Sequence, residues 1–172
     1  MRPVAGGLSD LVTSVLQVCQ VDQDDPRVAP LLAELAHEYS SRYGGTFEKL
    51  HEDLRGYPRE RFAPPDGALL LLLADGEPVA GGAFQRYDQR TAELKRIWTH
   101  SAHRRRGLAR RVVAELEREA AARGYERVYL TTGPRQPEAK ALYLAMGYRP
   151  LFDVTADPET IGPLAFEKPL GS

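Results

Sequence analysis

Cysteine is nearly absent from this chain, and its scarcity limits the chemistry available. Cys19 is the only cysteine among 172 residues, so the chain can form neither an internal disulfide nor a cysteine-rich zinc site. Cys19 lies in a strand-like segment, where a buried thiol usually behaves as a small hydrophobic group. His100 and His103 are not part of an HExxH motif, and no carboxylate cluster adjoins them in the sequence. We therefore expect no metal.

Long apolar runs, linkers and targeting signals are also missing. The longest apolar run, residues 68–74, is far shorter than the roughly 20 residues that a membrane-spanning helix needs. No repeat, low-complexity tract or Pro/Gly/Ser-rich linker divides the chain, which favours one domain over residues 1–172. The N-terminus lacks the basic and then apolar pattern of a signal peptide, so we expect a cytoplasmic protein with no membrane partner.

Strong net charge is absent as well. The 23 lysines and arginines and 24 aspartates and glutamates leave a formal net charge of −1. A nearly neutral chain has no global attraction to nucleic acid, and we expect no nucleic-acid partner. Five arginines are nevertheless dense locally, at positions 104, 105, 106, 110 and 111. Their expected partner is one small polyanion.

Hydrophobic periodicity and turn residues predict alternating strands and helices. Strands are expected at residues 13–21, 68–74, 79–86, 92–99, 127–132, 148–154 and 164–170, and helices at about 28–43, 47–54, 107–123 and 137–146. Asp75-Gly76 predicts a hairpin, and Gly81-Gly82 predicts a bulge. The expected fold class is α/β, with three layers: a mixed central sheet of about six to seven strands and helices on both faces. Residues 92–132 should form a right-handed parallel crossover.

The segment from His100 to Ala109 has features of a phosphate site. A strand-like run enters it, and a strongly periodic helix leaves it. The first N–H groups of a helix have no intrahelical partner, and the macrodipole makes that end electropositive. Gly107 would let the backbone approach a ligand closely. A tight turn with solvated arginines would give the same pattern, so the glycine alone leaves both interpretations open.

Three segments at characteristic distances carry a family resemblance. Residues 104–109, Arg-Arg-Arg-Gly-Leu-Ala, match the (Gln/Arg)-x-x-Gly-x-(Gly/Ala) motif of the GNAT superfamily of acyl-CoA N-acyltransferases. Residues 92–99 resemble its fourth strand, and residues 139–148 resemble its Ala-x-x-Leu-Tyr-x-x-x-Gly-(Phe/Tyr) segment. The resemblance implies a GNAT-like fold. It also implies an N-acetyltransferase that moves the acetyl group of acetyl-CoA to a primary amine by direct transfer in a ternary complex.

The resemblance implies roles for particular residues. Those expected to bind coenzyme A are Ile97, Trp98 and Thr99 along the pantetheine arm, Arg104, Arg105, Arg106, Gly107, Leu108 and Ala109 at the pyrophosphate, and Gln136, where many members have Asn. Tyr143 matches the family's usual general acid, and the alternative is a core aromatic. Glu93 stands fourteen residues before Gly107, where the family often carries its general base. The alternative for Glu93 is a surface carboxylate paired with Lys95.

The sequence indicates least about the amine that would accept the acetyl group. By resemblance, the first helices and the last hairpin wall its cleft, which here contain Tyr39, Tyr43, Phe47, His51, Asp153, Asp157 and Glu159. These carboxylates could favour a cationic acceptor, although charges in loops are most often solvated. We expect a small-molecule or peptide amine and a monomer or homodimer. Two other classes remain open: a non-catalytic acyl-CoA-binding or sensing module of the same fold, and nucleic-acid binding through the arginine run.

Overall fold

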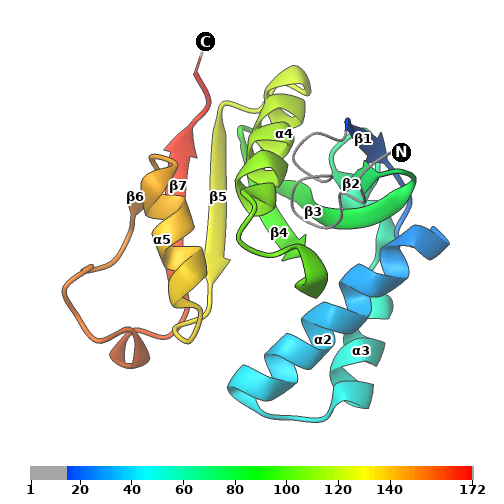
Figure 1. The fold of residues 1–172 in the computed structure, drawn as a ribbon. Coiled ribbons are helices and arrows are strands. Elements are labelled where there is room, and N and C mark those ends of the chain that lie inside the picture. Colours follow the sequence, from blue (N-terminus) through cyan, green and yellow to red (C-terminus); the bar gives the residue numbers. More distant parts are fainter. Residues whose placement is uncertain (1–14, 172) are drawn as a thin grey trace, which may run out of the picture.

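Seven strands form one sheet within residues 15–171, which the computed structural model describes (Figure 1). The strands are β1 (Leu16–Gln20), β2 (Ala68–Ala74), β3 (Glu77–Asp88), β4 (Thr91–Thr99), β5 (Arg127–Thr132), β6 (Arg149–Pro150) and β7 (Leu164–Pro169). Their spatial order is β1-β2-β3-β4-β5-β7-β6. The β4–β5 pair is parallel, and the other neighbours are antiparallel. The predicted hairpin at Asp75-Gly76 and the predicted parallel crossover are both confirmed.

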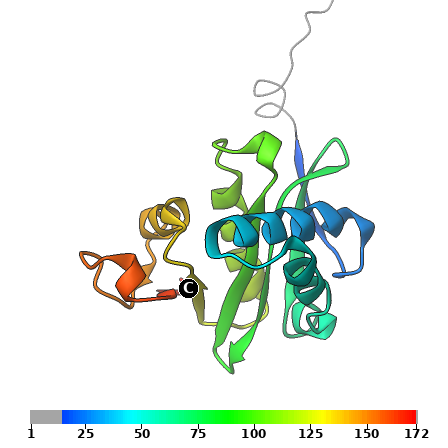
Figure 2. The same cartoon turned by 90° about the horizontal axis from the view of Figure 1, so that it is seen from below.

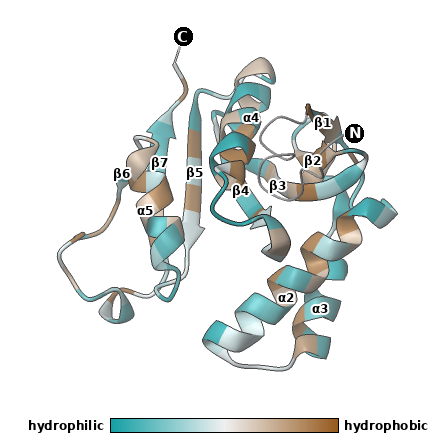
Figure 3. Ribbon diagram, in the orientation of Figure 1, coloured by the Kyte–Doolittle hydropathy of each residue, from teal (hydrophilic) through white to brown (hydrophobic). Residues whose placement is uncertain are grey.

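Helices cover both faces of the sheet, as the sequence predicts (Figures 1 and 2). They are α2 (Ala29–Tyr43), α3 (Phe47–Arg55), α4 (Leu108–Ala122) and α5 (Pro137–Ala145). A short 3₁₀ turn, Pro26–Val28, leads into α2, and the Asp25 side chain caps that turn by accepting from the Arg27 N–H at 2.9 Å. The hydrophobic residues of α2 and α4 form stripes with hydrophilic residues between them (Figure 3). The three-layer α/β architecture is therefore confirmed.

Two hydrophobic cores lie on opposite faces of the sheet, and β2 contributes to both. Leu70 and Leu72 pack into the core beneath α4, whereas Leu69, Leu71 and Leu73 pack into the core beneath α2. A strand that is covered on both faces needs apolar residues at every position. This explains why residues 68–74 are a continuous apolar run instead of an alternating one. Cys19 in β1 is partly buried and packs against the second core.

A bulge interrupts the pairing of β3 with β4. Gly81 faces Trp98 and Ala83 faces Lys95, so Gly82 alone opposes the two residues Arg96 and Ile97. The bulge predicted at Gly81-Gly82 is confirmed, although the extra residue belongs to β4. Arg96 takes the left-handed conformation, with φ of 64°. A Cβ on Gly82 would lie 2.8 Å from Ile97 Cδ1, so a larger residue there would force side chains at the bulge to shift.

The sheet opens between β4 and β5. These strands pair only where Thr91, Ala92 and Glu93 face Arg127, Val128 and Tyr129, and then they diverge (Figure 1). After this pairing, β4 carries the bulge and β5 continues beside β7. The backbone between the two strands is therefore free to bind an extended ligand.

One predicted strand is wrong over most of its length. Residues 148–154 were expected to be extended, but β6 contains only Arg149–Pro150. Pro150 has no N–H to donate to a neighbouring strand, and after it only Leu151 donates to β7, to the Ala165 carbonyl at 2.9 Å. The Asp153 carboxylate then accepts from the Thr155 N–H at 2.9 Å, which forms a turn. The predicted start of the first strand, Thr13, lies outside the described residues.

Within residues 15–171, none of the helices has the length and apolar character required to cross a membrane.

Candidate active site

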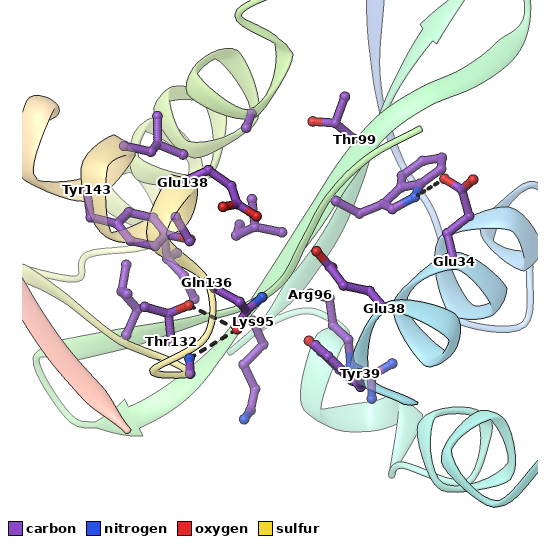
Figure 4. Close-up of a pocket in the computed structure, with 18 of the residues that line it drawn as sticks. Glu34, Glu38, Tyr39, Lys95, Arg96, Thr99, Thr132, Gln136, Glu138 and Tyr143 are labelled. Carbon is purple, nitrogen blue, oxygen red and sulfur yellow. Dashed lines mark hydrogen bonds between the residues drawn. The ribbon is translucent and has the colours of Figure 1, made fainter. Parts of the chain in front are cut away.

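A cavity of about 1240 Å³ occupies the opening between β4 and β5 (Figure 4). Residues of β4, β5 and the first turn of α4 line one part of it, together with α5. Residues of α2 and α3 line the other part. The cavity therefore connects the arginine-rich start of α4 with the face of the sheet that α2 and α3 cover.

Most of the predicted site residues line this cavity. They are Ile97, Trp98, Thr99, Arg104, Arg105, Gly107, Leu108, Ala109, Gln136 and Tyr143. Arg106 and Glu93 are not among the lining residues. Arg106 instead contacts His103, with its Nη1 3.3 Å from the Nδ1 atom of that histidine.

The first turn of α4 presents backbone donors that have no partner among residues 15–171. Its N-cap, Gly107, is left-handed with φ of 75°, no side chain caps the helix, and the first turn contains no acidic residue. The intrahelical bonds begin with Arg111, whose N–H donates to the Gly107 carbonyl at 3.1 Å. The N–H groups of Leu108, Ala109 and Arg110 are therefore free to bind an anion. This donor set fits a pyrophosphate.

The backbone conformation at Gly107 favours glycine. No atom lies within 4 Å of the position that a Cβ would occupy, so the structure itself does not exclude a side chain. The left-handed region costs an L-residue with a Cβ about 1–2 kcal/mol. Arg105 is also left-handed, with φ of 64°. Successive turns of this kind direct backbone N–H groups toward one point.

Tyr143 belongs both to the core and to the cavity wall. Its ring lies 5.5 Å from that of Tyr148 and 5.6 Å from that of Phe166, and the side chain is only 5% exposed. Its hydroxyl has no hydrogen-bond partner within residues 15–171, yet it is not among the fully buried unpaired atoms of that region. The hydroxyl is therefore open to the cavity. Burial raises the pKa of Tyr143 above its ordinary value, which keeps the O–H protonated.

Glu93 lies at the point where β4 and β5 separate. It is the last residue of β4 paired with β5, and its Oε1 accepts a hydrogen bond from Gln85 Nε2 at 2.9 Å. Gln85 in turn accepts a hydrogen bond from the Tyr57 hydroxyl. Lys95, two residues further along β4, lines the cavity. Leu94, next to Glu93, and Tyr57, at the other end of this hydrogen-bond chain, also line the cavity, so Glu93 lies beside the cavity without lining it.

Glu34 of α2 holds the end of β4 in place, a role that the sequence did not reveal. Its Oε1 accepts from Trp98 Nε1 and from the Ser101 N–H, both at 2.9 Å, and its Oε2 accepts from the Ser101 hydroxyl at 2.5 Å. Burial opposes the charge of Glu34, but the hydrogen bonds from Ser101 and Trp98 outweigh it and lower its pKa. This carboxylate joins α2 to the strand end that precedes the arginine-rich loop.

The C-terminal end of α2 contacts the loop between β5 and α5. Arg42 pairs with Glu138 and donates to the Arg135 carbonyl at 2.8 Å. The Tyr43 hydroxyl accepts from the Arg135 N–H at 3.1 Å and donates to Gln136 Oε1 at 3.3 Å. These contacts join the α2 side of the molecule to the α5 side across the opening.

Gln136 shapes its own loop. Its Oε1 accepts from the Gly133 N–H at 3.0 Å and from the Thr132 hydroxyl at 3.2 Å (Figure 4). Its Nε2 has no partner among residues 15–171. The oxygen therefore orients the loop, and the nitrogen remains available to a ligand in the cavity.

The predicted acceptor residues divide into two groups. Tyr39 and Tyr43 line the cavity. Phe47 instead stacks between His37 and His51, with ring centroids 4.0 Å and 5.0 Å away. The loop carboxylates also act elsewhere: Asp157 caps a 3₁₀ turn, Glu159 pairs with Arg135 at 2.7 Å, and Asp153 forms its turn with Thr155. These loop carboxylates are not part of the cavity.

Other charged residues in the cavity were not predicted: Glu34, Glu38, Arg42, Asp53, Lys95, Arg96 and Glu138. Lys95 and Arg96 are adjacent in a strand, where strict alternation would place them on opposite faces. This pair of adjacent cations was the available signal that the strand is irregular there. Within residues 15–171, no group of three His, Cys, Asp or Glu side chains is arranged to hold a metal ion.

The sheet has helices on both faces and opens between two parallel strands, beside a helix whose first N–H groups are uncapped. This combination is typical of acyltransferases with the GNAT fold. The family model described as "Acetyltransferase (GNAT) family" matches residues 32–148. The chain belongs to this family.

Known proteins of similar sequence and structure agree with this assignment. The chain is 36% identical over 93 residues to "Uncharacterized N-acetyltransferase YsnE" of Bacillus subtilis (strain 168), a match that covers 51% of this chain and 62% of that protein. The structure of a protein described as "putative acyl-CoA N-acyltransferase from Klebsiella pneumoniae" has a TM-score of 0.70 at 24% identity, covering 91% of this chain and 99% of that one. The PaiA N-acetyltransferase of Thermoplasma acidophilum, solved in complex with coenzyme A, also has a TM-score of 0.70, at 13% identity, covering 90% and 99%. At these identities the two structures establish the fold.

Proposed function

We propose that this protein transfers the acetyl group of acetyl-CoA to a primary amine, directly and within a ternary complex. The observation that carries the proposal is the continuity of one cavity. It joins the unpartnered N–H groups of α4 to the face covered by α2 and α3, and the Tyr143 hydroxyl opens into it. Cys19, the only cysteine, lies in β1 and does not line the cavity. Direct transfer therefore accounts for the site better than an acyl-cysteine intermediate.

The residues at the start of α4 would bind the pyrophosphate of acetyl-CoA. The N–H groups of Leu108, Ala109 and Arg110 supply directed hydrogen bonds, and Arg104 and Arg105 add positive charge from the cavity rim. The helix dipole alone contributes only about 0.3–1 kcal/mol at an exposed site, so the hydrogen bonds must carry most of the affinity. When bound, acetyl-CoA supplies the thioester that reacts with the amine.

The free backbone of β4 beyond Glu93 would hold the pantetheine arm. Ile97, Trp98 and Thr99 line the cavity, and the bulge at Arg96 changes the direction of the strand just before them. A backbone N–H at this position is suited to polarise the thioester carbonyl. The hydrogen bond from Trp98 Nε1 to the Glu34 carboxylate would keep this end of β4 fixed during the reaction.

Proton transfers complete the chemistry. An alkyl amine with a pKa of about 10.4 is mostly protonated at pH 7, so one proton must leave before the nitrogen attacks the carbonyl carbon. We assign its removal to Glu93, acting through water at the point where the strands part. After the attack the nitrogen carries a second surplus proton, which it loses as the carbon–sulfur bond breaks. The departing thiolate takes up a proton in turn and leaves as the free thiol, and Tyr143 donates a hydrogen bond to the sulfur as negative charge develops on it. The raised pKa of Tyr143 makes a hydrogen bond more favourable than full proton transfer.

The direct test is release of free thiol from acetyl-CoA in the presence of different amines. The panel should contain simple amines, amino acids, aminoglycosides and peptides with free N-termini. We expect amine-dependent thiol release together with an acetylated product of matching mass. Tight binding of acetyl-CoA without thiol release for any amine would support the non-catalytic module instead. Steeply salt-dependent DNA binding that coenzyme A does not affect would favour the nucleic-acid interpretation.

A further inference from the structure

The part of the cavity beneath α2 and α3 contains two cationic side chains, Lys95 and Arg96, that form no ion pair within residues 15–171. Arg96 reaches this part from the β4 bulge and lies beside Tyr39 (Figure 4). Its guanidinium carbon lies 5.3 Å from the ring centroids of both Tyr57 and Phe62. The side chain is largely buried, and burial lowers the pKa of Arg96. A charge in such a position is costly unless a counter-charge accompanies it.

No carboxylate within residues 15–171 forms an ion pair with Arg96. Its contacts to oxygen are two long ones, from Nη1 at 3.4 Å and Nη2 at 3.3 Å to the Leu54 carbonyl at the end of α3. A guanidinium has five N–H groups, so three of them have no partner there. Lys95 lines the same cavity and also has no ion pair in the described part of the chain.

The acids that line the cavity are engaged elsewhere: Glu38 and Glu138 both pair with Arg42, and Glu34 accepts hydrogen bonds from Trp98 and Ser101. Glu38 lies 3.3 Å from Arg42, and Asp53 lies 3.0 Å from Lys49. The predicted carboxylates of the last loop do not line the cavity. No ion pair within residues 15–171 joins any of these acids to Lys95 or Arg96, so these two cations have no carboxylate partner there.

We propose that Arg96 binds a carboxylate of the acceptor, so that the acceptor is an amine of the amino-acid class. A guanidinium presents paired N–H donors that match the two oxygens of a carboxylate. The aromatic rings of Tyr57 and Phe62 restrict the guanidinium, and the left-handed backbone at the bulge directs the side chain toward α3. An amino acid bound in this way brings its amine into the cavity that Tyr143 and the end of β4 also line. This proposal rests on the proposed acetyl transfer.

The position of Arg96 distinguishes this role from simple packing. Arg96 Nε has no partner within residues 15–171 and is not among the fully buried unpaired atoms of that region, so it is open to the cavity that Arg96 lines. Arg61 offers the comparison: it lies over the same Tyr57 ring, with its guanidinium carbon 5.9 Å from the centroid, but it is exposed and does not line the cavity. Both arginines therefore lie over the Tyr57 ring, but only Arg96 lines the cavity in which the acceptor would bind.

The test compares matched acceptors in matched variants. Free L-amino acids and their carboxamides share a side chain and differ at the carboxyl group. Values of kcat/KM are measured for each pair by thiol release at one pH, and the carboxylate/carboxamide ratio is compared between variants so that the different amine pKa values of the two acceptors cancel. We expect the wild-type protein to prefer the carboxylate by about 10- to 100-fold, the effect of a hydrogen bond to a charged group. Arg96→Gln should bring the ratio close to one while activity toward the carboxamide is retained. Arg96→Lys should keep part of the preference, and Arg61→Gln should keep all of it.

The outcomes separate this proposal from the proposed function. Thiol release with equal use of acids and carboxamides, or an unchanged preference in Arg96→Gln, would overturn the carboxylate site while acetyl transfer stands. If no amine releases thiol, the same pairs are titrated by calorimetry into protein saturated with coenzyme A. Binding of the amino acids that Arg96→Gln abolishes would then support the site without the activity. Absence of binding would refute it. Thermal unfolding of each variant checks that it is folded.

Discussion

At the scale of single residues, Tyr143 combines a buried aromatic ring with a hydroxyl group that is open to the cavity. The aromatic ring contributes packing against Tyr148 and Phe166, while the hydroxyl is open to the cavity. Substituting phenylalanine preserves the ring and removes only the hydroxyl. The two roles of Tyr143 can therefore be measured separately.

We expect Tyr143→Phe to lower kcat on the order of 10²-fold, because the departing sulfur loses a hydrogen-bond donor. Stability and acetyl-CoA affinity should remain near wild type. Tyr148→Phe is the control: the Tyr148 hydroxyl donates to Glu117 Oε2 at 2.6 Å and does not line the cavity. That variant should lose about 1 kcal/mol of stability and keep its kcat. Wild-type turnover in Tyr143→Phe would leave Tyr143 with its packing role only.

Glu93 and Glu38 are the two carboxylates to compare for removal of the amine proton. If Glu93 acts through water, Glu93→Gln should lower turnover on the order of 10²–10⁴-fold at neutral pH. The deficit should shrink as pH rises, because more of the amine is then already free. The measurement is the pH profile of kcat/KM with stability recorded in parallel. A Glu93→Gln profile that overlays wild type, together with a shifted profile in Glu38→Gln, would assign the base to α2.

At the scale of secondary-structure elements, α4 has a glycine with positive φ just outside each of its two ends. Gly107 precedes the helix with φ of 75°, and Gly124 follows it with φ of 94°. Neither has an atom within 4 Å of a built Cβ. Only Gly107 lines the cavity.

We expect Gly107→Glu to abolish binding of coenzyme A, because a carboxylate would stand among the donors that hold the pyrophosphate. Gly124→Glu should introduce similar backbone strain, about 1–2 kcal/mol, without changing affinity. Calorimetric titration with acetyl-CoA distinguishes the two variants. Unchanged affinity in a folded Gly107→Glu protein would exclude the start of α4 as the pyrophosphate site.

The Glu34 carboxylate joins α2 to the end of β4 through hydrogen bonds from Trp98 and Ser101, and this contribution depends on pH because Glu34 must be charged. Its pKa in the folded protein is below the ordinary value of 4.5, so its contribution to stability is fully present above pH 4.5 and is lost as pH falls through the lowered pKa. We expect Glu34→Gln to be less stable than wild type by about 1–2 kcal/mol at pH 7. The difference should narrow below pH 4.5.

Denaturant unfolding at several pH values measures the Glu34 effect. Glu52→Gln, an exposed residue of α3 that does not line the cavity, should show little change at any pH. A stability difference for Glu34→Gln that stays constant down to pH 3 would show that the charge of Glu34 does not contribute.

At the scale of the whole molecule, the opening between β4 and β5 divides the sheet. One part contains β1 to β4 and the other contains β5 to β7, and the two parts share three paired positions of the sheet. The contacts of Arg42 and Tyr43 with the β5–α5 loop join them again at the far side of the cavity. A ligand between the strands would contact both parts at once.

Acetyl-CoA should therefore stabilise the fold as a whole. At a concentration 100 times its Kd, a ligand that binds only the folded state contributes about 2.7 kcal/mol. For a chain of this size each kcal/mol raises Tm by roughly 2–4 °C, so we expect an increase of about 5–10 °C in a thermal scan. Gly107→Glu should remove the increase. A Tm independent of acetyl-CoA in the wild-type protein would contradict binding between the strands.

The sequence by itself determined the order and type of most elements and the location of the donor site. Local patterns carry that information: the apolar stripe of α4, the Asp75-Gly76 turn and the Gly107 motif are each readable within a few residues. The strand expected at residues 148–154 failed because Pro150 and the Asp153 turn, also local features, outweigh its apolar residues. Tyr143 was predicted because its segment matches a family motif.

Only the tertiary structure decided which way the residues of β4 point. Strict alternation places Leu94, Arg96 and Trp98 on one face, but the bulge at Arg96 puts Leu94 beneath α4 and Trp98 beneath α2. The sequence predicts a bulge at Gly81-Gly82, but only the pairing of β3 with β4 shows that the extra residue is Arg96 of β4. The same holds for Glu34, whose partners are more than 60 residues away in sequence. Contacts between residues so far apart in sequence depend on how the layers pack. The position of Arg96 and Lys95 in the cavity beneath α2 and α3 was therefore known only from the folded structure.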